Sequence, residues 1–328
     1  MIYEFNDIYV VSSGVVVGPL EMQGPLASYF DEGVLDEYVG QKSYEQAEQQ
    51  LLRKAIDYAC IKANIHLNEI NIACGGDLLN QLSSCNYVMK DCPFPFVGMY
   101  AACATSSLII GMAALLLTQS NQNYSMAALS SHYASAQRQF RYPNGYGMQK
   151  KATMTTTVSA GCALLLGKLK TDIKVKQLIV GKVYDSHFQD VNDMGSAMVH
   201  AVYYTLTNYL KETNASMNDF DLIVSGDLSN IGLQILKDLL KKDGYQNLDH
   251  LYDCGLMIYD IKKQKVFSGG SGCGCSMAVS LAYLFQMMKQ GKYKRILVLA
   301  SGALLTPILS AQKQSIPCIC HGIIYERS

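Results

Sequence analysis

Several features that define large classes of proteins are missing from this sequence. Its 27 Lys and Arg residues balance 27 Asp and Glu residues, so no overall charge attracts it to nucleic acid or to an anionic membrane. The first seven residues contain no basic stretch followed by an apolar one, which argues against a secretory signal. We therefore expect the 11 cysteines to be free thiols in a reducing compartment.

Patterns typical of metal sites and of membrane spans are missing as well. The pairs Cys273-x-Cys275 and Cys318-x-Cys320 have one-residue spacers, whereas zinc sites space paired cysteines by about two to four residues. The longest apolar run, residues 101–117, is interrupted by polar residues and is shorter than the roughly 20 residues that cross a bilayer. The sequence predicts a soluble chain without a metal site or transmembrane segment, whose membrane association would be peripheral.

Acidic residues are missing from residues 92–171, whereas six Lys and Arg residues lie there. The stretch that follows the strand-like residues 127–130 is polar and aromatic, and we expect a basic loop at 131–151. Within it, His132, Arg138 and Arg141 are candidate ligands for an anion, because arginine can hold a carboxylate with two parallel hydrogen bonds. The alternative is a solvated surface segment.

An internal repeat organises the rest of the chain. Residues 72–80 match residues 222–230: each copy is a short apolar strand that runs into Gly-Asp-Leu-x-Asn and then a helical stretch. Downstream of each copy, a turn of small residues opens an apolar helix, and two further strands follow. Alternating strands and helices predict an α/β fold with a mainly parallel sheet. We divide the chain into two duplicated halves that share one core, residues 1–172 and 173–328.

Local signals mark particular positions in these halves. The expected helix at residues 43–63 starts with a capping pattern, Ser43-x-x-Gln46, and repeats small and apolar residues on one face. Asp77 and Asp227 each end a strand and precede a helix, where a carboxylate can accept hydrogen bonds from free backbone N–H groups. Capping alone explains this repeated pattern, and a role in a site is the alternative.

Cys103 is the candidate nucleophile. It lies between the strand-like residues 94–100 and the apolar helical run 107–117. A thiol in the first turn of a buried helix feels the positive end of the helix dipole, which favours the thiolate. By itself, this position predicts an activated cysteine.

A duplicated α/β half with a cysteine before the buried helix of the first copy resembles the thiolase fold. Beyond the fold, the chain resembles the stage V sporulation protein AD (SpoVAD) family of endospore-forming bacteria, nearly from end to end. The stretches that carry this resemblance are Gly24-Pro25-Leu26, Gln41-Lys42-Ser43, Gly76-Asp77-Leu78-Leu79-Asn80-Gln81, Ser130-Ser131-His132, Arg138-Gln139-Phe140-Arg141-Tyr142-Pro143, Asp193-Met194-Gly195-Ser196, Asp253-Cys254-Gly255-Leu256, Gly269-Gly270-Ser271-Gly272-Cys273, Thr306-Pro307 and His321-Gly322.

The resemblance implies a fold, a ligand and partners. The fold would be two pseudo-twofold-related halves in α/β/α/β/α layers. The ligand would be dipicolinate (pyridine-2,6-dicarboxylate), free or as its calcium chelate, bound during uptake into the developing spore and release on germination. The partners would be the other SpoVA membrane proteins at the inner membrane of the spore or forespore, with no cofactor. A homodimer is also implied, through the strand after the nucleophile helix, residues 126–131.

The resemblance also bears on catalysis. Condensing and decarboxylating thiolase-fold enzymes pair their cysteine with a histidine, and with a second His or Asn, from the C-terminal half. At these positions the present chain has Asp227 and Ser271. An aspartate beside a thiol raises the pKa of the thiol, the reverse of activation. We therefore expect no enzyme, and a ligand pocket that includes Cys103, Asp227 and Ser271.

Two histidines keep an alternative open. His132 follows a strand of the first half, and His321 lies in the last-strand motif that approaches the nucleophile in thiolase-fold relatives. Either side chain could reach the Cys103 pocket and contact a ligand. The alternative function is an acyltransferase, of the thiolase or ketoacyl-synthase kind, that uses acyl-CoA or an acyl carrier and Cys103.

Overall fold

Ten strands of the twelve-stranded β-sheet form two five-stranded groups with the same internal order. The structure is a computed structural model and describes residues 1–140 and 150–328. The first group, in spatial order, contains β2 (Tyr9–Val17), β8 (Ala160–Gly167), β6 (Tyr124–Ser131), β4 (Ile72–Gly76) and β5 (Phe96–Gly98). The second contains β9 (Ile173–Val180), β14 (Cys318–Arg327), β13 (Arg295–Ala303), β10 (Leu222–Ser225) and β11 (Leu251–Asp253).

Strand directions repeat between the groups as well. In each, the first three strands are antiparallel neighbours and the last three are parallel neighbours. The groups meet at β2 and β9 through the single pair Tyr9 and Lys174. The matching strands β4 and β10 come from the repeated segments 72–80 and 222–230, so the structure confirms the duplication that the sequence predicts. The boundary at residue 172 itself remains a prediction.

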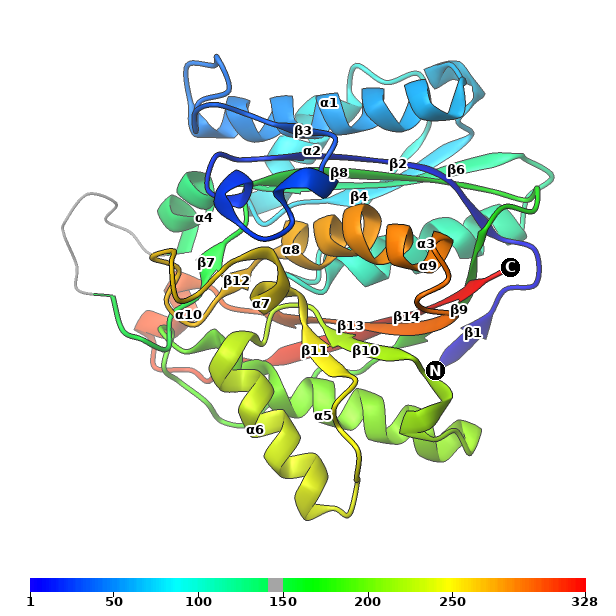
Figure 1. Cartoon of the computed structure of the whole chain (residues 1–328). Coiled ribbons are helices and arrows are strands. Elements are labelled where there is room, and N and C mark those ends of the chain that lie inside the picture. The colour runs from blue at the N-terminus through cyan, green and yellow to red at the C-terminus, as the bar shows by residue number, and fades with distance from the viewer. Residues whose placement is uncertain (141–149) are drawn as a thin grey trace.

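Helices divide the molecule into five layers, as expected (Figure 1). The outer layer over the first group contains α1 (Tyr44–Ala63) and α2 (Ser83–Met89). The central layer contains α3 (Thr105–Thr118) and the continuous run α8 (Cys273–Ala278), the π-helix η6 (Val279–Leu284) and α9 (Phe285–Lys289). The outer layer over the second group contains α5 (Met194–Thr213) and α6 (Ser229–Lys242).

Shorter elements connect these layers. The remaining strands are β1 (Ile2–Glu4), β3 (Glu32–Gly33), β7 (Thr156–Thr157) and β12 (Gly270–Ser271). The remaining α-helices are α4 (Tyr133–Phe140), α7 (Cys254–Ile258) and α10 (Pro307–Ala311). Single 3-10 turns are η1 (Glu21–Gln23), η2 (Ala27–Tyr29), η3 (Leu67–Glu69), η4 (Asn80–Leu82) and η5 (Met217–Asp219). Parallel pairing of β7 with β12 ties the first half to the second beside Cys103.

Local sequence explains why α1 begins and packs where it does. The hydroxyl of Ser43 accepts a hydrogen bond from the backbone N–H of Gln46, at 3.3 Å. The face that the sequence predicts to be buried, Ala47, Leu51 and Ala55, is fully buried against β2 and β8. Small residues on this face let the helix approach the sheet closely, and the cap satisfies a backbone N–H group of its first turn.

The central helix α3 holds the two halves together. It is apolar around most of its circumference, which is typical of a helix buried on all sides. Its side chain Ile109 belongs to the same hydrophobic cluster as Leu164 of the first half and Leu178 and Val298 of the second. The two halves therefore share one core. In the part of the chain that the structure describes, no helix is both long and apolar enough to cross a membrane.

The expectation of a loop after β6 is wrong. Residues 133–140 form the helix α4 rather than a loop, because the Nδ1 atom of His132 accepts a hydrogen bond from the N–H of Ala134, at 3.1 Å, and so caps the helix. An imidazole cap is not one of the usual capping signals. β6, the expected dimerisation strand, is paired on both edges, with β4 and β8, so a second copy cannot extend the sheet there. Dimerisation itself stays a prediction.

Candidate functional site

Cys103 lies in a sharp turn immediately before α3, not in its first turn. The preceding residue, Ala102, has a φ of 50°, a left-handed conformation that an alanine adopts only when its surroundings impose it. Thr105 imposes it here. Its hydroxyl donates to the carbonyl of Ala102 at 2.7 Å and accepts from the N–H of Ala101 at 2.9 Å. The turn directs the thiol away from the helix and into a cavity between the halves.

The second half approaches the thiol with a serine and an aspartate. The Oγ atom of Ser271 lies 3.9 Å from the Sγ atom of Cys103 and donates to Asp227 at 2.9 Å. Asp227 also accepts from the hydroxyl of Ser301 at 2.9 Å and from the N–H of Gly272 at 3.3 Å. Asp227 and Ser271 thus lie at the cysteine, as the sequence predicts.

This environment opposes ionisation of the thiol. Burial raises the pKa of the Cys103 thiol well above its ordinary value, and the nearby charge of Asp227 raises it further. The hydrogen-bond contact with the hydroxyl of Ser271 acts in the opposite direction but is the smaller effect. The activated thiolate predicted from the helix dipole alone is therefore wrong, and the direction inferred from Asp227 is correct. At neutral pH, Cys103 is a neutral thiol.

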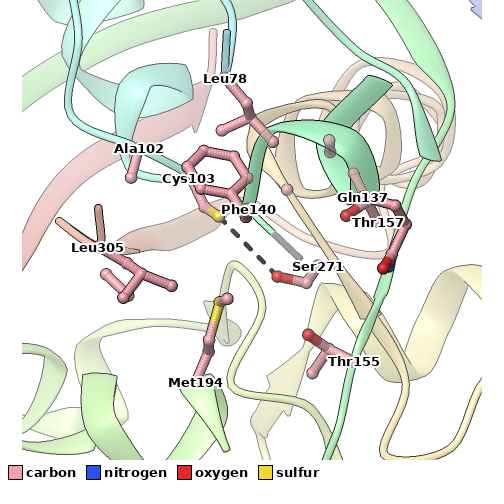
Figure 2. Close-up of a pocket in the computed structure, with 13 residues that line it drawn as sticks. Leu78, Ala102, Cys103, Gln137, Phe140, Thr155, Thr157, Met194, Ser271 and Leu305 are labelled. Carbon is pink, nitrogen blue, oxygen red and sulfur yellow. Dashed lines mark hydrogen bonds between the residues drawn. The ribbon is translucent and has the colours of Figure 1, made fainter. Parts of the chain in front are cut away.

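The thiol opens onto a small inner cavity of about 40 Å³. Figure 2 shows Cys103, Phe140, Met194, Leu305 and Ser271 around the same space. The other lining residues are also uncharged: Leu78, Ala102, Ala136, Gln137, Thr155, Thr157, Gly272 and Ala303. A cavity needs about 10–15 Å³ on this measure to hold one water molecule, so the inner cavity has room for a few.

A larger outer cavity of about 620 Å³ adjoins the inner one. Leu78, Phe140 and Leu305 line both, so these three side chains separate them. The outer cavity is further lined by Leu79, Asn80, Gln81, Leu82, Tyr100, Gln139, Thr306, Pro307, Ile308 and Leu309. Its volume falls within the range of about 300 to 1,000 Å³ that is typical of small-molecule sites, and its polar side chains carry amides and hydroxyls. Among the described residues, no charged side chain lines either cavity.

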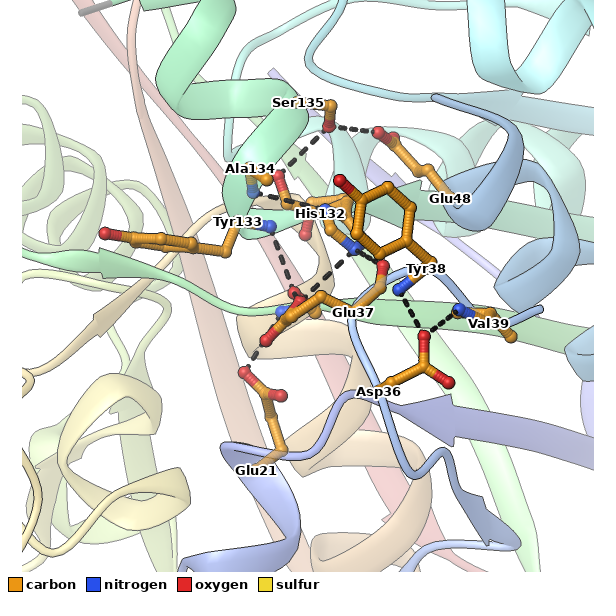
Figure 3. Close-up of polar contacts among 12 residues, drawn as sticks. Glu21, Asp36, Glu37, Tyr38, Val39, Glu48, His132, Tyr133, Ala134 and Ser135 are labelled. Carbon is orange, nitrogen blue, oxygen red and sulfur yellow. Dashed lines mark hydrogen bonds and ion pairs between the residues drawn. The ribbon is translucent and has the colours of Figure 1, made fainter. Parts of the chain in front are cut away.

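His132 lines neither cavity. Figure 3 shows its ring among Glu37, Tyr38 and Ala134. Its Nε2 atom lies 2.8 Å from the carbonyl oxygen of Glu37 and 3.3 Å from the carboxylate of the same residue. Because Nδ1 accepts from Ala134, the proton of the neutral ring is on Nε2. Burial lowers the pKa of His132, so the ring is neutral at pH 7. The predicted ligand role is not supported by this position.

The other predicted basic residues do not line the cavities either. Arg138 extends from α4 toward α1 and forms an ion pair with Glu45. His321 accepts a hydrogen bond from the N–H of Gly181 at 3.3 Å, and burial lowers its pKa to about 4. Arg141 lies outside the described residues. Of the seven predicted ligand residues, Cys103 and Ser271 line the inner cavity, and Asp227 lies directly behind Ser271.

The two repeated aspartates differ in what they do. Asp77 accepts from the N–H groups of Leu79 and Cys85, both at 2.7 Å, and so caps the start of α2 as expected. In the second half, the equivalent turn is held by Asp253, which accepts from the N–H of Leu228 at 2.9 Å. Because Asp253 caps the turn in the second half, the carboxyl of Asp227 is available to Ser271 and Ser301.

Sequence reasoning did not identify most of the residues that form the two cavities. Met194 and Thr306 lie in stretches that carry the family resemblance, but nothing local to them points to a ligand. Leu78 belongs to the repeated Gly-Asp-Leu segment. These side chains come from separate elements and meet only in the folded chain. Among the described residues, no group of three or more His, Cys, Asp and Glu side chains could hold a metal ion.

Comparison with solved structures identifies the class of fold. The chain matches 3-oxoacyl-[acyl-carrier-protein] synthase III from Aquifex aeolicus VF5 with a TM-score of 0.60 and 12% identity, over 97% of this chain and 99% of the other. It matches OleA from Xanthomonas campestris, co-crystallised with cerulenin, with a TM-score of 0.61 and 12% identity, over 98% of this chain and 97% of the other. At these identities the likeness shows the fold alone, and that is the thiolase fold.

Sequence comparison identifies the family. The model of the family "Stage V sporulation protein AD (SpoVAD)" matches residues 2–326. Stage V sporulation protein AD of Bacillus subtilis (strain 168) is 43% identical over 323 residues, which cover 98% of this chain and 95% of that protein. The chain belongs to the stage V sporulation protein AD family, and its role is in sporulation.

Proposed function

We propose that the chain is a non-enzymatic binding protein for dipicolinate, held as its calcium chelate in the outer cavity. It would act in the uptake of dipicolinate into the developing spore and in its release on germination. The observation that carries the proposal is a cavity of about 620 Å³ with apolar walls and uncharged polar groups, next to a thiol that is kept neutral.

The chemistry around Cys103 supports binding over turnover. A thiolase-type reaction needs a thiolate and a partner that can accept or donate a proton. Burial and Asp227 keep the thiol protonated, and its nearest polar partner from the second half is the hydroxyl of Ser271. Among the described lining residues of both cavities there is no histidine. Asp227, which lies behind Ser271, raises the pKa of the thiol and so does not activate it as a nucleophile.

The outer cavity suits a flat aromatic ring. Leu78, Tyr100, Phe140 and Leu305 offer apolar surface, and rings favour offset or edge contacts with other rings. The amides of Asn80, Gln81 and Gln139 offer donors to carboxylate oxygens. The inner cavity, at about 40 Å³, is too small for such a ligand. We therefore assign the ring to the outer cavity.

The uncharged lining of the outer cavity favours the calcium chelate over the free dipicolinate dianion. Burying an unpaired carboxylate is strongly unfavourable, and a dianion has two. In a one-to-one chelate, Ca²⁺ cancels both charges before the ligand enters, so an uncharged pocket suffices. Arg138 is the nearest described cation in sequence to Phe140, and it is already paired with Glu45. Arg138 and Arg141 remain the candidates for binding free dipicolinate.

Calorimetric titration of the full chain tests the proposal. We expect saturable heat with calcium dipicolinate, a weaker response to dipicolinate with a chelator of calcium present, and none above background with calcium benzoate. Phe140→Ala should weaken binding of the chelate about tenfold, because it removes one apolar wall. Tyr252→Ala is the matched control, since Tyr252 is 48% exposed on β11 and lines neither cavity. Equal affinities of these two variants would contradict the assignment of the site.

The acyltransferase alternative has its own readout. Incubation with acyl-CoA would add the mass of the acyl group to the peptide that contains Cys103, and Cys103→Ala would abolish the addition. We expect no mass change, because a neutral thiol is a poor nucleophile. Arg138→Ala and Arg141→Ala test the two arginines. If these variants bind free dipicolinate more weakly but bind the calcium chelate as well as the unaltered chain does, the arginines bind the free dianion.

Partners and location are part of the same proposal. The chain would lie at the inner membrane of the spore or forespore, peripherally, together with the other SpoVA membrane proteins. It would form a homodimer through β5, whose described pairing is with β4 on one edge. An open strand edge can pair with a second copy. Light scattering that gives a monomer mass at micromolar concentration would contradict the dimer.

A further inference from the structure

The end of the central layer opposite Cys103 carries a predominantly basic surface. Three segments meet there: the β8–β9 turn, the α9–β13 loop and the end of β14. Backbone hydrogen bonds join them, from Ser328 N–H to the carbonyl of Asp172 at 2.9 Å and from Arg327 N–H to the carbonyl of Lys294 at 2.7 Å. Figure 1 shows the end of α9, the start of β9 and the C-terminal strand on the same side of the molecule.

We define the basic patch as the six cations that these segments supply. They are Lys168, Lys170, Lys289, Lys292, Lys294 and Arg327. Five of them are exposed, and Lys168 is partly exposed, with its ammonium group 2.5 Å from the carbonyl of Ser120. None forms an ion pair with a carboxylate of the described residues. Two acidic side chains lie beside them: Asp172, and the exposed Asp221, whose carboxylate accepts hydrogen bonds from the N–H groups of Lys294 and Arg295. Six cations against these two carboxylates leave the patch with a positive excess.

An exposed leucine lies at the tip of the patch. Leu169 is 77% exposed in the β8–β9 turn, between Lys168 and Lys170. A large apolar side chain flanked by lysines is the arrangement with which peripheral proteins enter the boundary between lipid headgroups and acyl chains. An acidic protein would be recognised through directional pairs, for which arginine is the better residue, and five of the six cations here are lysines.

We propose that the basic patch binds directly to an anionic lipid bilayer, with Leu169 inserted among the headgroups. The α8–η6–α9 run begins at Cys273, directly after Gly272 in the wall of the inner cavity, and ends at Lys289 in the patch. A run of this length, residues 273–289, spans about 25 Å. The patch and the ligand cavity thus lie at opposite ends of the central layer, and a chain docked through the patch presents its cavity to the aqueous phase.

Vesicle co-sedimentation of the full chain tests this docking. We expect binding to vesicles of equal parts phosphatidylglycerol and phosphatidylcholine at low salt, loss of binding at high salt, and no binding to phosphatidylcholine alone. Each lysine near an anionic surface is worth about fivefold in the partition coefficient, so Lys168→Gln/Lys170→Gln should weaken binding about 25-fold. Leu169→Ser should weaken it about tenfold through lost apolar burial.

A matched control has the same change of charge at the other end of the molecule. Lys262→Gln/Lys263→Gln alters two exposed lysines in the loop before β12, and we expect vesicle binding to be unchanged. Equal loss in both double variants, or no binding of the unaltered chain to anionic vesicles, would overturn the proposal. Capture on immobilised poly-glutamate without vesicle binding would assign the patch to an acidic protein and overturn it too. Calcium dipicolinate titration of the patch variant should match the unaltered chain, so failure of ligand binding and failure of docking are distinguishable.

Discussion

The buried carboxyl of Glu48 gives a prediction that links the site to pH. Glu48 lies on the inner face of α1 and is fully buried. Its carboxyl oxygens accept a hydrogen bond from Ser130 at 3.1 Å. They accept a second one from Ser135 at 2.6 Å, which Figure 3 shows. Ser135 belongs to α4, the helix that supplies Phe140 to both cavities. Glu48 therefore connects α1 to the element that forms the cavity wall.

Protonation of Glu48 determines how much this connection stabilises the fold. Burial, and then the charge of Asp77, raises the pKa of Glu48 from its ordinary value of 4.5 to about 8. A raised pKa in the folded state means that the stabilisation is complete below pH 4.5 and is lost as the pH rises through 8. Between pH 5 and 8.5 this one group changes the free energy of unfolding by about 4 kcal/mol.

Replacing Glu48 by glutamine removes the titration and keeps the shape of the side chain. We expect Glu48→Gln to gain about 4 kcal/mol relative to the unaltered chain when the pH is raised from about 5 to about 8.5. Urea denaturation followed by far-ultraviolet circular dichroism measures the two free energies at each pH. Burial also raises the pKa of Asp77 to about 6 and of Glu21 and Asp253 to about 7. Glu21 and Asp253 titrate in both variants, so the difference between the variants reports Glu48 together with its interaction with Asp77.

The control and the refuting result are both specific. Glu212→Gln makes the same chemical change at an exposed position on α5 and is the control. If Glu48→Gln changed stability by the same amount at both ends of this pH range, the carboxyl would not titrate within it. The reasoning from burial would then be wrong.

Two further predictions concern the turn at Cys103. The charge of Asp227 is the largest cause, after burial, of the raised pKa of the Cys103 thiol. Asp227→Asn removes this charge, so the pH profile of iodoacetamide labelling of Cys103, measured by peptide mass, should move to lower pH. An unchanged profile would leave burial as the sole cause. Gly302→Ala would place a Cβ atom 2.2 Å from the carbonyl oxygen of Ala101, and we expect a loss of about 1–3 kcal/mol in urea denaturation. An unchanged free energy of unfolding would show that the turn at Ala101 can shift away from the added methyl group.

Much of the fold could be predicted because its signals are local. The repeat of Gly-Asp-Leu-x-Asn identifies equivalent turns, and the Ser43 cap identifies the start of α1. The helix α4 could not be predicted because its cap is an imidazole, whose role depends on Glu37 holding the other ring nitrogen. The interior position of β6 could not be predicted because strand order depends on pairings between segments far apart in the chain.

The site could be predicted only where a family motif marks it. Cys103, Asp227 and Ser271 follow from the pattern of catalytic positions, and the structure brings them together. Arg138 is expected at the ligand, but Glu45, which is 93 residues away in sequence, takes its guanidinium group. No spacing in the sequence reveals such a pair. The apolar walls of the cavities raise the same difficulty, since Leu and Phe side chains are equally at home in any core.

The central claim is that a neutral chelate binds in the outer cavity and no covalent chemistry takes place at Cys103. A crystal structure of the chain with calcium dipicolinate tests it most directly. The account predicts the ring between Tyr100, Phe140 and Leu305, with the carboxylate groups near the amides of residues 80 and 81 and an unmodified thiol at Cys103. A ligand bound elsewhere on the chain, or a covalent adduct on the sulfur of Cys103, would contradict it.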